Sequence, residues 1–186
     1  MIILGIGSHA ADIRAIAHRC NIHNITEYDD LLDCHQTPPD CLRGPLMVGV
    51  NNPAQRREIA KRWPHVRGAA PLIDPSAIIG PDVHCGYGSV VAPMATLLTR
   101  VRLGAHVHVN YHASMTRCTI GDYTTVSPGA VICGDVTIGQ AVLIGAGAVV
   151  ADRCVIGDDV IIAAGAIVPP ESVIPDGAKC IGVWKP

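Results

Sequence analysis

Aromatic residues are scarce in this sequence. Its 186 residues include two Trp, four Tyr and no Phe, although Gly is abundant and nearly half of the residues are hydrophobic. A globular core without Phe is unusual, because large aromatic side chains supply much of the buried area in most domains. A stack of thin, repetitive layers filled by aliphatic side chains explains this composition better.

Other absences narrow the class of protein. The formal net charge of -2 and the mixed charge pattern leave no basic stripe for nucleic acid. The sequence contains no stretch of 18 apolar residues, so it predicts no membrane-spanning helix. The eight cysteines form no C-x-x-C pair, so a zinc or thioredoxin-like motif is unsupported. The first residues lack a basic flank and a small-residue cleavage site. We therefore expect a cytoplasmic protein with reduced thiols.

The last two-thirds of the chain repeats an aliphatic residue at every sixth position, with one slip. The repeat runs through Ile73, Ile79, Cys85, Val91, Leu97, Leu103, Val109 and Met115, and then through Ile120, Val126, Ile132, Ile138, Ile144, Val150, Ile156, Ile162, Val168 and Ile174. Six residues make one short strand and one turn, and three such units close a triangular coil. The small residue after each aliphatic one suits a corner with unusual backbone angles. The pattern predicts a left-handed parallel β-helix.

One unit of the repeat, Met115–Thr119, has five residues where the others have six. Solenoids tolerate irregular corners, so the missing residue is consistent with a shortened turn. A departure in a regular array is also consistent with a working site. The sequence leaves both interpretations open.

Residues 1–70, which come before the repeat, follow a different pattern. We expect α/β structure over residues 1–70, in the form of a small βαβ (Rossmann-like) unit, and the all-β solenoid over residues 71–186. The expected elements are strands at 2–4, 24–28 and 46–50, a helix whose apolar face carries Ile13, Ile16, Ala17 and Cys20, and a helix from Pro53 to Trp63 capped by Asn52.

The turn Gly5-x-Gly7-x-x-Ala10 between the first strand and helix is typical of phosphate-binding sites. Its glycines let the backbone approach a phosphate, and the helix N-terminus offers free N–H groups. Many strand-to-helix turns contain two glycines for steric reasons alone. Asp29 and Asp30 follow the second strand, where carboxylates accept hydrogen bonds from a ribose or a base. Together these features favour nucleotide binding.

All nine histidines lie at or before residue 112, and three of them, His106, His108 and His112, cluster just ahead of the short unit. Metal ligation is one alternative, as in a γ-type carbonic anhydrase, because His106 and His112 share one position of the repeat and His84 lies one coil earlier. No acidic network accompanies them, and such a lyase has no use for a nucleotide unit. We therefore expect no metal.

The order of these features resembles one family of sugar acyltransferases, the sialic acid O-acetyltransferase and bacillosamine N-acetyltransferase family. The matching stretches are 3–10, 28–30, 47–52, 72–77 and 120–157, together with Gly182 and Val183. The resemblance implies an N-terminal unit that binds a nucleotide-linked sugar, a homotrimer of solenoids, and acetyl-CoA lying in the groove between neighbouring solenoids.

The resemblance also assigns residues. The implied contacts to the sugar nucleotide are Gly7, Ser8, His9, Asp29, Asp30, Gly49 and Val50. The residues implied to line the acetyl-CoA groove, mostly through main-chain groups, are Thr125, Ala146 and Ala164. Trp184 stands where relatives often have Pro, and either stacks on the adenine or covers the last coil.

The catalytic base is where this chain departs from the family. Relatives carry a His next to an acidic residue shortly before the Gly of the next coil, and that His removes a proton from the acceptor. Here the stretch is Thr116-Arg117-Cys118. His112 is the nearest candidate base on the same coil, with His108 and His106 behind it. The resulting hypotheses are an acetyl-CoA-dependent O- or N-acetyltransferase, or a non-catalytic relative that binds a nucleotide sugar.

Overall fold

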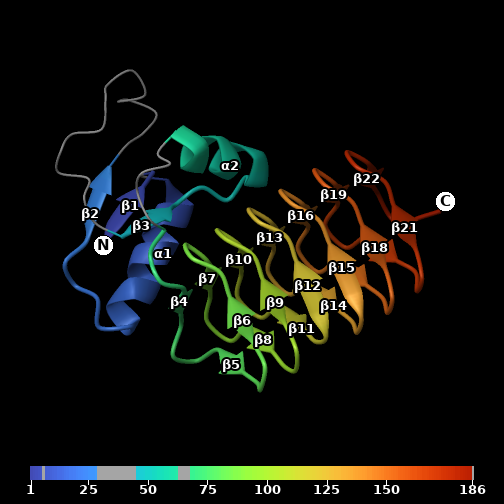
Figure 1. Cartoon of the computed structure of the whole chain (residues 1–186), viewed down its shortest axis with the longest axis horizontal. Helices are drawn as coiled ribbons and strands as arrows, with labels where there is room; N and C mark the ends of the chain where they lie inside the picture. Colours follow the sequence, from blue (N-terminus) through green and yellow to red (C-terminus); the bar gives the residue numbers. More distant parts are fainter. Residues whose placement is uncertain (6, 29–44, 63–67, 186) are drawn as a thin grey trace.

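The computed structural model describes residues 1–5, 7–28, 45–62 and 68–185. Within these residues the chain forms an N-terminal unit of short strands and two helices, followed by a long solenoid of stacked coils (Figure 1). The solenoid is a left-handed parallel β-helix, as the six-residue repeat predicts. Neither helix in the described part of the chain has the length and apolar character that crossing a membrane requires.

The N-terminal unit contains a parallel sheet in which β1 (Ile2–Leu4) lies between β2 (Thr26–Tyr28) and β3 (Leu46–Val48). Every residue of β1 and β3 is buried, as their continuous apolar runs predict. Helix α1 (Ser8–Arg19) follows β1, and helix α2 (Pro53–Arg62) follows β3. The second and third strands are shorter than the sequence suggests, since β2 begins only at Thr26 and β3 ends at Val48.

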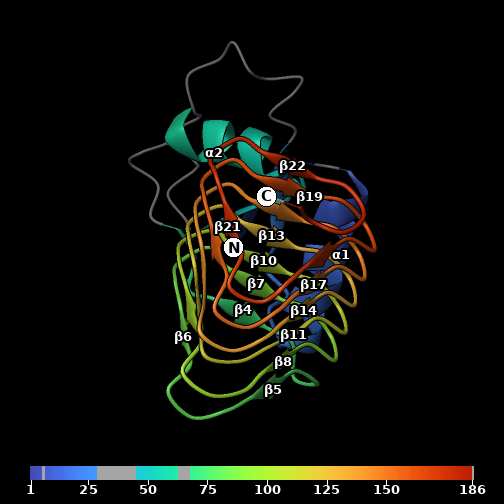
Figure 2. The same cartoon turned by 90° about the vertical axis from the view of Figure 1, so that its right-hand side faces the viewer.

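The solenoid has three flat faces, each a parallel sheet (Figure 2). Sheet 1 contains β4 (Leu72–Ile73), β7 (Val90–Val91), β10 (His108–Val109), β13 (Thr125–Val126), β16 (Leu143–Ile144), β19 (Ile161–Ile162) and β22 (Lys179–Cys180). Sheet 2 contains β5 (Ile78–Ile79), β8 (Thr96–Leu97), β11 (Ser114–Met115), β14 (Val131–Ile132), β17 (Val149–Val150) and β20 (Ile167–Val168). Sheet 3 contains β6 (His84–Cys85), β9 (Arg102–Leu103), β12 (Cys118–Ile120), β15 (Val136–Ile138), β18 (Val155–Ile156) and β21 (Val173–Ile174).

The core of the solenoid contains the predicted aliphatic positions, stacked in columns, together with smaller side chains between them. From Val91 to Ile174 each of these aliphatic positions is buried, whereas Ile79 in the first coil is 40% exposed because no coil covers it from the other side. Burying one such side chain stabilises the fold by about 1.5–3 kcal/mol. The six cysteines among the described residues form no disulfide, and Cys118 lies in the core, where burial raises the pKa of its thiol to about 12.

The turns between the sheets form three edges. We call the turns from sheet 1 to sheet 2 the first corner edge, those from sheet 2 to sheet 3 the second, and those from sheet 3 back to sheet 1 the third. Non-glycine residues at many turns have φ near +60°, among them His106 on the third edge and His112 on the first. Backbone hydrogen bonds join successive turns along each edge, for example from Gly165 N to Ala146 O at 2.8 Å.

The five-residue unit Met115–Thr119 is absorbed in a turn of the second corner edge. Met115 pairs with Leu97 in the coil before and with Ile132 in the coil after, so the strands on both sides remain in register. Arg117 occupies the shortened turn with a φ of 42°. The missing residue therefore shortens one corner without interrupting any sheet.

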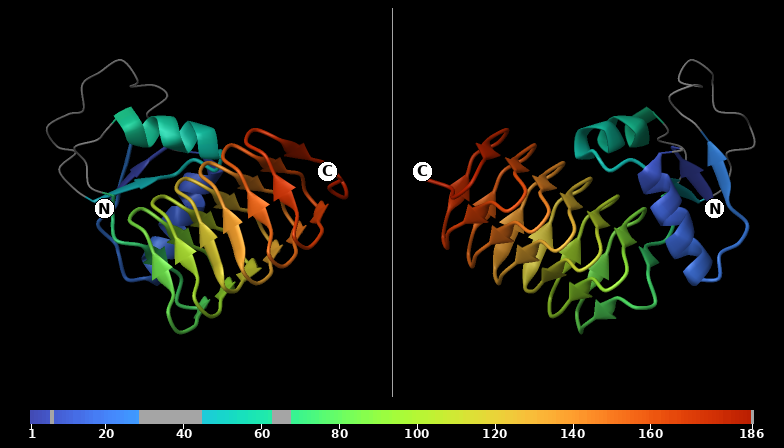
Figure 3. Two further views of the ribbon diagram at one scale, coloured as in Figure 1. Left: turned by 45° about the vertical axis from the view of Figure 1, so that its right-hand side comes forward. Right: turned by 180° about the vertical axis from the view of Figure 1, so that it is seen from behind.

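Helix α1 packs on the outer face of sheet 1, at the coils nearest the N-terminal unit (Figure 3). The buried face of α1 contributes Ile13, Ile16 and Ala17, and it meets Leu72 and Val90 of sheet 1 in one apolar cluster. These are three of the four helix residues whose spacing predicts a buried face. An ion pair from Arg19 to the buried carboxylate of Asp74 (Nε to Oδ2, 2.6 Å) adds a polar contact at the end of the helix.

Helix α2 is fixed to the third corner edge by a buried arginine. The Arg56 side chain is 0% exposed, and its guanidinium donates to the carbonyl oxygens of Val50, Asn51, His106 and Thr124, among others, and to the Thr125 hydroxyl. Its partners among the described residues are neutral oxygens, and burial lowers the pKa of Arg56 to about 9. The group therefore remains a cation near neutral pH.

A histidine pair forms a third contact between the two parts. His9 in the first turn of α1 and His108 on β10 lie with His9 Nε2 and His108 Nδ1 2.6 Å apart. Burial lowers the pKa of His9 from 6.5 to about 4, and the Arg56 cation adds to the effect. Burial also lowers the pKa of His108 well below its ordinary value. Both rings are therefore neutral at physiological pH.

Replacing Arg56 by Lys is expected to lower the free energy of unfolding by about 3 kcal/mol, because one ammonium group leaves several buried carbonyl oxygens without a donor. Urea denaturation measures this change. Arg57→Lys is the matched control in the same helix turn, since the ion pair of Arg57 with Asp159 lies at the surface and is worth under about 1 kcal/mol. Equal losses in the two variants would contradict the role of Arg56.

Stability is expected to fall as the pH falls from about 6.5 towards 4. In that window an unfolded chain protonates His9 while the folded chain does not, which costs about 1.4 kcal/mol per pH unit for one such histidine. His106 and His108 shift in the same direction and steepen the slope. Urea titrations at several pH values should show a smaller slope for His9→Gln than for the same change at exposed His84. Identical slopes would refute the assignment.

Candidate functional site

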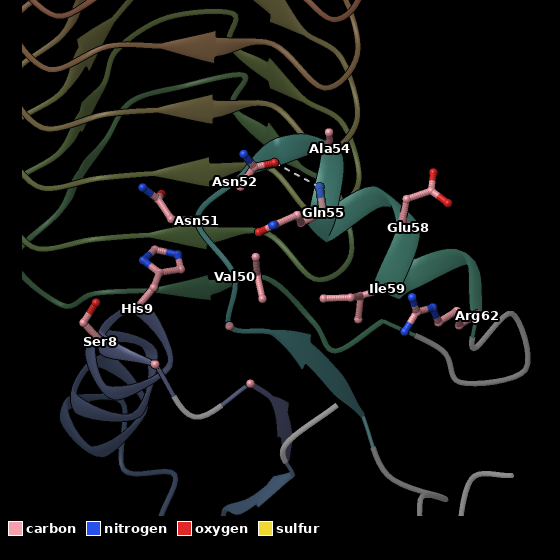
Figure 4. Close-up of a pocket in the computed structure, with 13 residues that line it drawn as sticks. Ser8, His9, Val50, Asn51, Asn52, Ala54, Gln55, Glu58, Ile59 and Arg62 are labelled. Carbon is pink, nitrogen blue, oxygen red and sulfur yellow. Dashed lines mark hydrogen bonds between the residues drawn. The ribbon is translucent and has the colours of Figure 1, made fainter. Parts of the chain in front are cut away.

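Two cavities adjoin α1, and the larger one lies between the start of α1, the segment after β3, and α2 (Figure 4). Its volume is about 860 Å³. It is lined by Gly5, Gly7, Ser8, His9, Gly49, Val50, Asn51, Asn52, Ala54, Gln55, Glu58, Ile59 and Arg62. A cavity of this size accommodates a ligand as large as a nucleotide.

Two glycines allow α1 to start close to the sheet. A Cβ atom on Gly49 would lie 2.7 Å from the Cβ of Ala10, so the segment after β3 passes α1 at a distance that only glycine permits. Gly5 has a φ of 104°, which glycine adopts readily. Gly5 and Gly49 therefore have a clear steric function, because they allow α1 and the segment after β3 to pack closely. That function does not conflict with ligand binding, because the same close packing places the start of α1 at the cavity wall.

The start of α1 offers unpaired donors to the cavity. Gly7 is the N-cap and provides no side-chain hydrogen bond, and the first turn contains no acidic residue. The first backbone bond of the helix runs from Ala11 N to Gly7 O, so the preceding N–H groups have no intrahelical acceptor. A Cβ atom on Gly7 would meet nothing within 4 Å. This geometry suits an anionic group such as a phosphate.

Helix α2 and the segment before it form the opposite wall. Asn51, Gln55 and Glu58 supply polar groups, and Val50 and Ile59 supply an apolar surface (Figure 4). Asn52 caps the helix, with its Oδ1 accepting from Gln55 N at 3.0 Å. The wall therefore combines an apolar surface with hydrogen-bonding groups.

The structure brings together five of the seven residues predicted to contact a sugar nucleotide. Gly7, Ser8, His9, Gly49 and Val50 all line the cavity. The other two, Asp29 and Asp30, lie outside the described residues. The sequence predicts α2 and its Asn52 cap, but nothing in it assigns the polar residues of α2 to the site. A polar helix face looks the same in a sequence whether it faces solvent or a cavity.

The predicted base and two predicted donor-site residues share the first corner edge. His112 is exposed there, in edge-to-face contact with Tyr111. Ala146 and Ala164 occupy later turns of the same edge and are exposed. Their backbone N–H groups have no acceptor among the described residues. Thr125, the third predicted donor-site residue, is instead buried on β13, and its hydroxyl donates to Asn51 O at 2.8 Å.

A smaller cavity of about 160 Å³ lies between α1 and sheet 1. It extends from His9 and His108 to Asn110 and Tyr111. His9 lines both cavities, and Tyr111 is the neighbour of His112. The residues that line this cavity therefore extend from the start of α1 to Tyr111 on the first corner edge.

The other two candidate bases lie in different surroundings. His108 is fully buried beneath α1. His106 lies on the third corner edge, stacked on Tyr123 at 5.5 Å between ring centroids, and burial lowers its pKa. His106 and His112 thus occupy different edges. In the described part of the chain no three His, Cys, Asp or Glu side chains gather where they could hold a metal ion.

The short unit places an arginine where the resemblance would put a catalytic histidine. Arg117 pairs with Asp135 (Nε to Oδ1, 3.4 Å) and approaches Asp152 at 4.0 Å. Its guanidinium covers Gly134, at which a Cβ atom would collide with it. A guanidinium is always protonated near neutral pH and cannot accept a proton there. This turn is therefore held by a charge cluster and contains no base.

Trp184 packs against the core of the last coil. Its backbone N–H donates to Ile167 O at 2.9 Å. Of the two roles open to Trp184, covering the last coil agrees with these contacts.

Comparisons with known proteins agree with this architecture. Residues 117–152 and 135–170 match the family described as bacterial transferase hexapeptide (six repeats). The acetyltransferase domain of PglB from Neisseria gonorrhoeae, solved with acetyl coenzyme A, superposes with a TM-score of 0.83 at 27% identity, covering 96% of this chain and 93% of that one. PerB from Caulobacter crescentus, solved with CoA and GDP-perosamine, has the same fold, with a TM-score of 0.82, 23% identity and coverage of 94% and 90%.

A shorter sequence match is also to an acetyltransferase. The GDP-perosamine N-acetyltransferase of Escherichia coli O157:H7 is 34% identical over 57 residues, which make up 30% of this chain and 26% of that protein. The match thus spans about a quarter of that relative. Residues 117–170 of the chain carry the repeats of the bacterial transferase hexapeptide family, on a fold shared with solved acetyltransferases.

Proposed function

We propose that this protein transfers an acetyl group from acetyl-CoA to an amine or hydroxyl of a nucleotide-linked sugar. The observation that carries the proposal is the large cavity at the uncapped start of α1, on a chain whose solenoid also exposes a histidine and free N–H groups along one edge. The PglB domain, solved with acetyl coenzyme A, supports the choice of donor. PerB, solved with GDP-perosamine, supports the class of acceptor.

In this proposal residues 1–70 form the Rossmann-like unit that holds the nucleotide, and residues 71–186 form the catalytic solenoid. The backbone N–H groups at the start of α1 bind the diphosphate, beside Gly7, Ser8 and His9. The apolar surface of Val50 and Ile59 contacts the base or the sugar. Asp29 and Asp30 remain proposed contacts to the ribose or the base.

The acyl donor would lie along the first corner edge. Ala146 and Ala164 have small side chains and free N–H groups, which lets a ligand approach the backbone closely and hydrogen-bond to it. Thr125 contributes by holding Asn51 in place at the cavity wall. The bound donor supplies a thioester carbonyl, which the acceptor attacks.

We assign the general base to His112. Its imidazole accepts the proton that the acceptor amine or hydroxyl loses as the new bond to the acetyl carbon forms. The bond from the acetyl carbon to sulfur then breaks, and the CoA thiolate takes the proton back from the imidazolium and leaves as the thiol. The backbone N–H groups of the same edge stabilise the negative charge on the carbonyl oxygen. Arg117 cannot take the place of His112, because a guanidinium does not serve as a proton acceptor near neutral pH and Arg117 is paired with Asp135.

Incubation with acetyl-CoA and a panel of amino- and hydroxy-sugar nucleotides tests the activity, with products identified by mass spectrometry and CoA release followed by thiol titration. We expect a mass gain of one acetyl group on one acceptor class. His112→Ala should lower turnover by about 10²–10⁴-fold while leaving nucleotide binding intact. Unchanged turnover would eliminate His112 as the base, and nucleotide-sugar binding without transfer would favour the non-catalytic alternative.

We also propose that the solenoid assembles as a homotrimer. Its outer faces expose aliphatic side chains that a partner would cover, among them Val131 (37% exposed) and Ile167 (45%) on sheet 2 and Val173 (66%) on sheet 3. Light scattering should give three times the mass of the 19.5 kDa chain. A monomeric mass at micromolar concentration would overturn this assignment.

A further inference from the structure

His108 is a polar residue buried on the outer face of the solenoid. It occupies the outer face of β10, where its neighbours in the sheet are Val90 on β7 and Thr125 on β13. Helix α1 covers this face, and His108 is only 1% exposed. An apolar or β-branched side chain would fill the place without burying a polar ring. The polar ring therefore calls for an explanation beyond packing.

The polar contacts of the ring are asymmetric. His108 Nδ1 lies 2.6 Å from His9 Nε2, and the ring centroids are 4.8 Å apart. His108 Nε2 is buried and has no hydrogen-bond partner among the described residues. The charged group that acts on both rings is Arg56, a cation, which opposes protonation of either one. The short contact is thus a hydrogen bond between two neutral imidazoles.

Two arrangements of the shared proton are possible, and they differ in what they leave buried. If His9 donated from Nε2, His108 would carry its own proton on Nε2, where a buried N–H has no acceptor. If His108 donates from Nδ1, its Nε2 is left with only an unused lone pair. An orphaned N–H is the rarer and costlier state in protein interiors. The second arrangement is therefore favoured.

We propose that His108 is a positioning residue that fixes the tautomer of His9, so that His9 presents its Nδ1–H to a ligand in the large cavity. His9 lines that cavity and lies next to the uncapped N–H groups of α1. The ligand atom that matches a neutral N–H donor at this place is an oxygen of a diphosphate. This identification of the ligand rests on the proposed function, whereas the tautomer of His9 does not.

The tautomer is measured directly by long-range ¹H–¹⁵N correlation NMR on the full-length protein with ¹⁵N-labelled histidine, at pH 7.5. We expect both His9 and His108 to carry the proton on Nδ1. Spectra of His9→Gln and His108→Asn identify the two signals. A His9 ring protonated on Nε2 would overturn the proposal, whatever the protein binds.

The effect on binding is measured by calorimetry with GDP, UDP and dTDP as probes. His108→Val, which copies the neighbouring Val90, should weaken binding of the preferred nucleotide about tenfold. His108→Asn, whose amide N–H lies near the place of Nδ1, should recover most of the affinity. His84→Val is the matched control, because His84 holds the same strand position on β6 but is exposed. It should bind as the unmodified chain does.

The calorimetry and the NMR experiment distinguish a failure of the positioning role of His108 from a failure of the proposed function. Unchanged affinity in a folded His108→Val variant would overturn the positioning role. Loss of affinity in both His108 variants, with no recovery by Asn, would also count against it, because a merely structural defect predicts that result. If the unmodified chain bound none of the nucleotides, the proposed function would fail, while the NMR experiment would still decide the tautomer of His9.

Discussion

The buried guanidinium of Arg56 is the contact on which the arrangement of the site depends. It joins three pieces of backbone that are far apart in the sequence: its own helix α2, the segment after β3, and two turns of the third corner edge. A cation buried without a carboxylate is costly, so it is tolerated only where its N–H groups find acceptors. Carbonyl oxygens at solenoid corners meet this need, because the regular coil leaves some of them unpaired. The position of the cavity wall thus follows from the backbone of the repeat.

The charges where α1 and α2 meet the solenoid also affect the histidines buried there. Burial and the Arg56 cation lower the pKa values of His9, His106 and His108, and the nearby Asp122 carboxylate only partly offsets this at His106. Such rings are poor proton acceptors near pH 7, and they serve better as fixed hydrogen-bond donors. An exposed histidine on a separate edge is then free for proton transfer. In the proposed function, the contact between the N-terminal unit and the solenoid thus serves recognition, and the proposed base His112 on the solenoid surface serves acid-base chemistry.

The sequence predicted the solenoid well because every coil repeats the same inward residue, so that an error at one position is corrected by its neighbours. The elements of the N-terminal unit were also predicted, since Ile2–Leu4, Ile13 and Asn52 carry local signals of strand, helix face and cap. The contacts between the two parts were not. Arg56 reads as one more charge on a polar helix, and His108 as one member of a histidine cluster. Their roles arise only when α1 and α2 pack on the solenoid, which no local pattern encodes.

Val183 and Trp184 affect whether two solenoids could stack end to end. A stack of parallel coils ends in strands whose backbone groups could continue the ladder with another chain. Here Val183 forms a bridge to Ile167 beyond the last strand of sheet 2, and Trp184 packs over the last core layer. At the opposite end, α1 lies against β4, while Ile78 and Ile79 of β5 remain exposed. End-to-end stacking of two solenoids through this face would therefore require displacing Val183 and Trp184 from the coil that they cover.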